Sequence, residues 1–287
     1  MKRLIACATA CVALAAAAAG TAAAKPPTLH VSGKWTITVR RHGVVTRRVR
    51  FENQLQGGGP VAQVLAGKVT PGAWRILSPS SGVTIPATVT LNDDSVFLTG
   101  DQTFSATRTL SDVATQYYAC APSVAPADCQ SSGGTFTPFT FRNGVNIAVK
   151  AGDSVHFVVR LSFSVPAGIG DASGLLASVL AGKATVGPWV LDVIGDTHEW
   201  QELPTTAGWS TSSFTLTTSF VSAQTTDTTL TEFVARMIEC DADVAPSSCT
   251  ATEASAQFPP VFHHTFGPGT VVAAEQQANI VWAVKFS

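Results

Sequence analysis

The chain has 287 residues, with 18 basic and 19 acidic side chains and a formal net charge of −1 at neutral pH. Charged residues make up only 13% of the sequence, while Thr, Ser, Val, Ala and Gly dominate it. This composition is typical of β-sheet proteins with polar faces and many turns, and it argues against a mainly helical protein. The length suits one large domain or two ordinary ones.

Residues 1–24 have the pattern of a signal peptide: a basic start at Met1–Arg3, an apolar stretch from Leu4 to about Ala19, and an Ala-rich end. Cleavage after Ala24 predicts a protein that is secreted, periplasmic or on the surface of a bacterium. The alternative is a lipid anchor on Cys7, because residues 4–7 resemble a lipoprotein box, although that box stands at the start of the apolar stretch rather than after it. No later segment is long enough to be a transmembrane helix.

The mature N-terminus is strongly basic. Residues 25–50 hold seven Lys and Arg and no acidic residue, whereas residues 51–287 hold nine basic and 19 acidic residues. Apolar residues alternate from Trp35 to Val39 and from Val45 to Phe51, which predicts a hairpin with a three-residue loop and a left-handed Gly43. Five arginines on it are candidates for contact with an anionic partner: Arg40, Arg41, Arg47, Arg48 and Arg50.

Several partners fit such a basic hairpin. The protein itself is one, since the acidic body of a neighbouring subunit would complement the charge; an anionic envelope polymer or glycan is another. Nucleic acid is the least favoured, because export is predicted and aromatic residues do not alternate with the arginines. Alternatively, the arginines have no partner and only discourage aggregation between strand edges.

An internal repeat follows the hairpin. Residues 59–74 and 174–189 are identical at 10 of 16 positions without a gap. In each copy the segment predicts a short helix that ends at Gly67 or Gly182, with a lysine directly after the glycine. Trp74 and Trp189 come seven residues after those glycines, and we expect both to anchor a strand in the core.

The remaining sequence alternates as strands do, for example over residues 88–91, 95–98 and 214–220. A turn at residues 151–153 predicts a hairpin between two of the strands. The expected fold is all-β, with two tandem jelly-roll-like β-sandwich domains at residues 25–165 and 166–287. Each domain carries one short helix and one local disulfide loop.

Four cysteines remain after the signal peptide, in two pairs that are each nine positions apart. An exported chain with this spacing predicts the disulfides Cys120–Cys129 and Cys240–Cys249. A four-cysteine zinc site is the alternative, but the Cys-x2-Cys spacing that is usual for it is absent.

Motifs for catalysis are lacking in the sequence. It has no Gly-x-Ser-x-Gly elbow and no phosphate loop, and the segment at His198-Glu199 lacks the second histidine of a zinc protease. We therefore predict no catalytic, metal or cofactor site, and a non-enzymatic extracellular protein that is structural or adhesive and assembles with itself. One alternative is a carbohydrate-binding module in which Trp200 and Trp209 stack on sugar rings. A second is a hydrolase without a recognisable motif, because carboxylate pairs can come from distant strands.

The order of motifs in the first copy also resembles a known module. A basic strand ends at Phe51-Glu52-Asn53, a Gly-rich step leads into the short helix, and Phe141-Arg142, residues 149–154 and a closing strand at 158–163 follow. This pattern is similar to a jelly-roll-type module of phage tail and tail-fibre-associated proteins and of some exported bacterial proteins. The resemblance covers most of residues 33–164 and implies a structural or adhesive unit, often oligomeric. The second copy departs from it, since Asn53 has no counterpart there and residues 273–275 replace the Gly-Asp turn.

Overall fold

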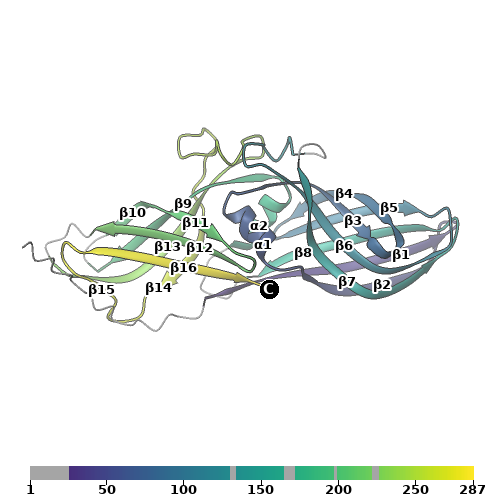
Figure 1. Cartoon of the computed structure of the whole chain (residues 1–287), viewed down its shortest axis with the longest axis horizontal. Helices are drawn as coiled ribbons and strands as arrows, with labels where there is room; N and C mark the ends of the chain where they lie inside the picture. Colours follow the sequence, from purple (N-terminus) through teal and green to yellow (C-terminus); the bar gives the residue numbers. More distant parts are fainter. Residues whose placement is uncertain (1–25, 130–133, 165–171, 197–198, 222–225) are drawn as a thin grey trace, which may run out of the picture.

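A computed structural model describes residues 26–129, 134–164, 172–196, 199–221 and 226–287. The predicted signal peptide lies outside these residues. We call residues 25–165 the first copy and residues 166–287 the second copy. The molecule is elongated, with the first copy at one end, the second copy at the other and the two helices between them (Figure 1).

Strands dominate both copies, which confirms the all-β prediction. The first copy contains β1 (Thr28–Arg41), β2 (Val44–Leu55), α1 (Gly59–Leu65), β3 (Thr70–Ser78), β4 (Val83–Asn92), β5 (Ser95–Thr103), β6 (Arg108–Cys120), β7 (Thr135–Val149) and β8 (Ser154–Ser164), with one 3₁₀ turn at Pro79–Ser81. The second copy contains α2 (Ala172–Leu180), β9 (Ala184–Gly195), β10 (Glu199–Pro204), β11 (Thr206–Trp209), β12 (Ser213–Val221), β13 (Thr228–Asp241), β14 (Pro260–Thr265), β15 (Val271–Val272) and β16 (Gln277–Phe286).

The first copy forms one sheet that closes on itself. Its strands follow the order β1-β2-β7-β6-β3-β4-β5-β8, and β8 pairs with β1 from Ser164 to Ser154. Trp35, Ile37 and Val39 alternate along β1 and are buried inside. The expected β-sandwich is therefore not confirmed for this copy, because alternation predicts which side chains are buried but not whether a sheet closes. Closure is weakest between β2 and β7, which pair only through Gln54 and Leu55 among the described residues.

The second copy is open. Its strands form a five-stranded sheet, in which β10-β9-β13-β14 follow one another and β15 also pairs with β13. A second group, β11-β12-β16, joins β1 through a short parallel pairing of Thr28 with Lys285. In sequence, β16 matches β8, while β14 matches β7 because each follows the strand with the first cysteine of a disulfide. The first copy bridges β7 and β8 with β1 and β2. Within the residues that the structure describes, nothing bridges β14 and β16.

Each helix contacts strands of the other copy: α1 contacts β11 and β12, and α2 contacts β5 and β8. A left-handed glycine lies two residues after the last residue of each helix, Gly67 after α1 and Gly182 after α2, where the sequence predicts the helices to stop. The indole of Trp74 donates a 2.9 Å hydrogen bond to the carbonyl of Leu180 in α2, and that of Trp189 donates a 2.8 Å bond to Leu65 in α1. Each tryptophan thus pairs a carbonyl that a helix C-terminus leaves unsatisfied. Both are buried, which confirms them as core anchors.

Two disulfides join Cys120 to Cys129 and Cys240 to Cys249, which confirms the predicted pairing. The two disulfide loops also contact each other. Ala127 N–H donates to Ala242 C=O at 3.0 Å, and Ser247 N–H donates to Pro122 C=O at 2.9 Å. Because each donor and acceptor pair matches the other at an offset of 120 residues, the copies meet around an approximate twofold axis.

The predicted hairpin is present as β1 and β2, but its loop differs from the prediction. The loop has two residues, His42 and Gly43, both with positive φ, as in a type I′ turn. A β-bulge shifts the register after Val39 and Arg40 and inserts one extra residue into β2. The extra residue of the bulge, rather than an odd loop, puts Phe51 on the same face of the hairpin as Trp35, and the two rings stack. Val45 lies before the bulge, so it is exposed instead of facing the core.

Candidate functional site

The outer edge of β2 is the first part of the candidate site. From Val44 to Asn53 this edge pairs with no described strand, although the other edge of β2 pairs with β1 along its length. Val44 and Val45, at the tip of the hairpin, are 68% and 45% exposed. An exposed edge of this kind offers backbone N–H and C=O groups to another strand.

The five candidate arginines divide into two groups. Arg41 makes bonds of 2.7 and 2.9 Å to both carboxylate oxygens of Asp153, a buried residue at the turn between β7 and β8. The Arg41 guanidinium, helped by the backbone N–H of Lys150, lowers the pKa of Asp153 to about 2. Arg41 is therefore a structural anchor of the hairpin rather than a free partner contact.

The other four arginines lie at the surface of the protein. Arg47, Arg48 and Arg50 are exposed on β2, and Arg40 is half-buried on β1. Arg47 donates one 3.4 Å hydrogen bond to the backbone carbonyl of Asn146 in β7, across the gap beside β2. None of these four forms a salt bridge with a carboxylate in the described part of the chain.

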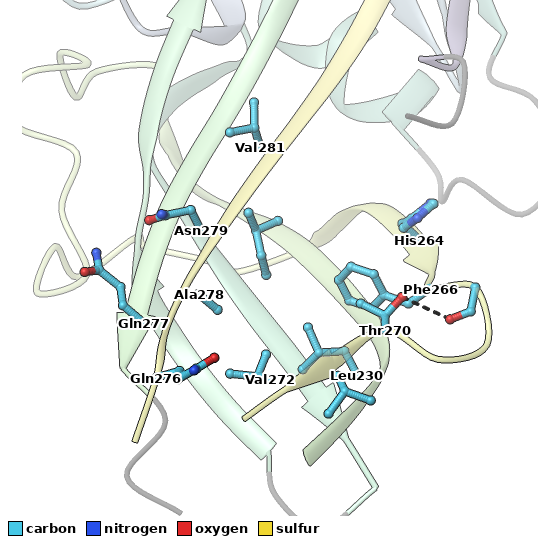
Figure 2. Close-up of a pocket in the computed structure, with 13 residues that line it drawn as sticks. Leu230, His264, Phe266, Thr270, Val272, Gln276, Gln277, Ala278, Asn279 and Val281 are labelled. Carbon is cyan, nitrogen blue, oxygen red and sulfur yellow. Dashed lines mark hydrogen bonds between the residues drawn. The ribbon is translucent and has the colours of Figure 1, made fainter. Parts of the chain in front are cut away.

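The second part of the site is a groove of about 480 Å³ in the second copy. Figure 2 shows β16 with Gln277, Asn279 and Val281 on one side of it, and Leu230, Phe266 and His264 on the other. It lies between β14, β15 and β16, where the first copy has its hairpin. We call this groove the open seam. Val271 and Val281, at its rim, are 51% and 69% exposed.

Two histidines lie beside the open seam on β14. His263 Nε2 is 2.7 Å from a carboxylate oxygen of Glu232, while His264 packs against the rings of Phe233 and Phe266. Burial lowers the pKa of His264, and the neighbouring His263 lowers it further. The two side chains therefore have different surroundings. Among the described residues, no group of three His, Cys, Asp or Glu side chains is placed to hold a metal ion.

The two tryptophans proposed for glycan stacking are not equivalent. Trp209 ends β11 and is 46% exposed, the only exposed large aromatic side chain in the described part of the chain. The backbone of Trp200 pairs with Val193 in β9, but its side chain lies outside the described residues. The structure therefore supplies one exposed ring and does not test the pair.

The open seam is the part of the site that sequence reasoning missed. The signal was available, because the hairpin at residues 34–51 has no full counterpart in the second copy.

No protein-family model, curated protein or solved structure matches this chain. The resemblance to phage-tail modules therefore stays a prediction. None of the described helices is long and apolar enough to cross a membrane.

Proposed function

We propose that this protein is a non-enzymatic, extracellular structural or adhesive subunit that associates with itself through its basic hairpin. The observation that supports this most is a set of three arginines beside an exposed strand edge, none of which has a carboxylate partner among the described residues: Arg47, Arg48 and Arg50. Guanidinium groups without a carboxylate partner fit an anionic partner from another molecule.

Charge in the rest of the chain supports an identical subunit as that partner. Residues 25–165 hold 13 basic and seven acidic side chains, whereas residues 166–287 hold three basic and 12 acidic ones. The first copy of one molecule therefore attracts the second copy of another. The predicted signal peptide and the two disulfides are compatible with an oxidising, extracellular setting.

The test is the molar mass in solution, measured by light scattering over a range of concentrations at low salt and at about 1 M salt, where charges are screened within about 3 Å. We expect oligomers at low salt that dissociate at high salt, and a loss of association when Arg47, Arg48 and Arg50 are all changed to Gln. Deleting residues 25–50 is unsuitable, because it removes β1 and most of β2 from the barrel-like sheet. A wild-type protein that stays monomeric at every concentration would contradict the proposal.

A carbohydrate-binding module is the second candidate, and the exposure of Trp209 supports it. Sugar rings stack on exposed aromatic faces, so binding should quench tryptophan fluorescence. A Trp209→Ala variant should then lose both quenching and retention on a glycan array. Silence of the wild-type protein across plant, fungal and bacterial glycans would exclude this candidate.

A further inference from the structure

We propose that the open seam of the second copy accepts strand β2 from another molecule of this chain, so that molecules join head to tail. The inference rests on the proposed function, since it names the two surfaces through which self-association would occur. The matched strands β8 and β16 differ in how far a neighbour covers them. In the first copy, β8 is covered by β1 from His30 to Arg40, whereas among the described strands the matching edge of β16 is covered only near Lys285.

The backbone of β16 is free to bind a strand. Lys285 and Ser287 donate their N–H groups toward β1, to Pro27 and Leu29 at 2.9 and 3.1 Å, while Phe286 donates toward Ser212 on the other side. Since successive residues of a strand point to opposite edges, the N–H groups of Gln277, Asn279 and Val281 face the open seam. No described residue accepts a hydrogen bond from them.

Strand β2 has the complementary features. Gln56 N–H donates to Phe139 C=O at 2.8 Å on the β7 side, so by the same alternation Arg48 and Arg50 turn their backbone groups to the bare outer edge. Joining two bare edges lets each supply the hydrogen bonds that the other lacks, which is how an added strand extends a sheet.

Apolar and charged side chains favour this pairing over an unrelated strand. Four of the six large hydrophobic side chains exposed among the described residues lie at these two edges: Val44, Val45, Val271 and Val281. Two acidic residues adjoin the seam and oppose in sign the arginines of β2: Glu275 directly precedes the lining residue Gln276, and Asp227 accepts a hydrogen bond from the N–H of Ala274. An incoming β2 would therefore cover apolar surface and meet charges of the opposite sign.

The two edges lie toward opposite ends of the molecule (Figure 1). The tip of the hairpin is at the outer end of the first copy, and β15 with the start of β16 is at the outer end of the second. A contact between two different surfaces leaves one of each free on every dimer, so it continues into a linear chain or a ring.

The test uses one variant for each edge. Val281→Pro removes an N–H that faces the open seam, and its control, Val281→Thr, keeps that N–H. Arg48→Glu with Arg50→Glu reverses the charge of β2, and the double lysine variant is its control. Val281→Pro and the double glutamate variant should each associate with themselves at least tenfold more weakly than the wild type does. Both controls should assemble as the wild type does.

Mixing distinguishes this arrangement from any other. Val281→Pro molecules keep a competent β2, and Arg48→Glu/Arg50→Glu molecules keep a competent seam, so an equimolar mixture should form one-to-one dimers and nothing larger. Asn279→Lys provides a second seam variant that leaves the backbone intact but repels the arginines. Analytical ultracentrifugation measures all of these, with near-ultraviolet circular dichroism as the check on folding.

Two results would overturn the inference and leave the proposed function standing: a folded Val281→Pro and a folded Asn279→Lys that both assemble like the wild type, or a mixture that stays monomeric while the wild type assembles. A wild-type protein that never assembles would instead remove the proposed function itself.

Discussion

The two copies share a sequence motif, a buried tryptophan and a disulfide, yet only the first has a closed sheet. The difference is the hairpin β1–β2, which covers β8 in the first copy, whereas no described strand takes its place along β16 in the second. Repetition of a core motif therefore does not guarantee repetition of a complete fold. In this chain the proposed binding surface comes from strands that the described part of the second copy lacks, rather than from an added feature.

The largest effect should come from residues that the copies share. Trp74→Ala and Trp189→Ala each remove a fully buried ring and its hydrogen bond to a helix of the other copy. We expect each to lower the free energy of unfolding by about 3–5 kcal/mol, measured by denaturant titration. If one variant cost much less than the other, the copies would not be equivalent at their junction.

The same substitution at matched positions should separate the copies. Val158 in β8 lies between β1 and β5, whereas Val281, 123 positions later in β16, has neighbours on one side only among the described strands. Val158→Pro should cost about 3 kcal/mol or more, because proline removes a ladder hydrogen bond in a central strand. Val281→Pro should cost far less, since its N–H faces the bare edge. Equal costs in denaturant titrations would mean that the edge of β16 is covered.

Matched glycines test the disulfide loops of both copies. A Cβ on Gly72 would lie 1.9 Å from the carbonyl oxygen of Cys129, and one on Gly187 would lie 2.7 Å from that of Cys249. We expect Gly72→Ala and Gly187→Ala to destabilise the protein by about 1–3 kcal/mol through overpacking. Gly174→Ala is the control, because open space surrounds that helical site and alanine should stabilise it by up to about 1 kcal/mol. A melting temperature of Gly174→Ala below those of Gly72→Ala and Gly187→Ala would refute this explanation.

The smallest effect concerns the anchor of the hairpin, which only the first copy has. Asp153→Asn breaks the ion pair with Arg41 and should lower the melting temperature at pH 7. The pKa of Asp153 in the folded protein is about 2, below the ordinary value of about 3.9. Its stabilisation is therefore complete above about pH 4 and is lost as the pH falls through about 2. The difference in melting temperature between wild type and variant should shrink over that interval, and a constant difference would show that the charge does not matter.

Local features were predictable from the sequence, and partners between distant strands were not. The spacing of nine residues was enough for Cys120–Cys129, and the glycine after each helix was enough for its end. Alternation placed Trp35 in the core, but it could not reveal the bulge next to Val39, because a bulge and an odd loop change the parity of β2 in the same way. The hydrogen bond from Trp74 to Leu180 spans 106 positions, and nothing local to either residue encodes it.

The open seam could have been inferred from the repeat. A strand that matches β8 requires the cover that β8 has, and the second copy has no full counterpart of the hairpin that supplies this cover in the first. Its groove residues, such as His264 and Phe266, carry no motif of their own and become a group only when β14 is placed opposite β16.

The crossed contacts also make the folding of each copy depend on the other. Trp74 finds its hydrogen-bond acceptor in Leu180, Trp189 finds its own in Leu65, and the first residues of β1 pair with Lys285 and Phe286. Domains generally fold as units, one after another. Here neither copy completes its packing alone, so the two should fold and unfold in a single cooperative step.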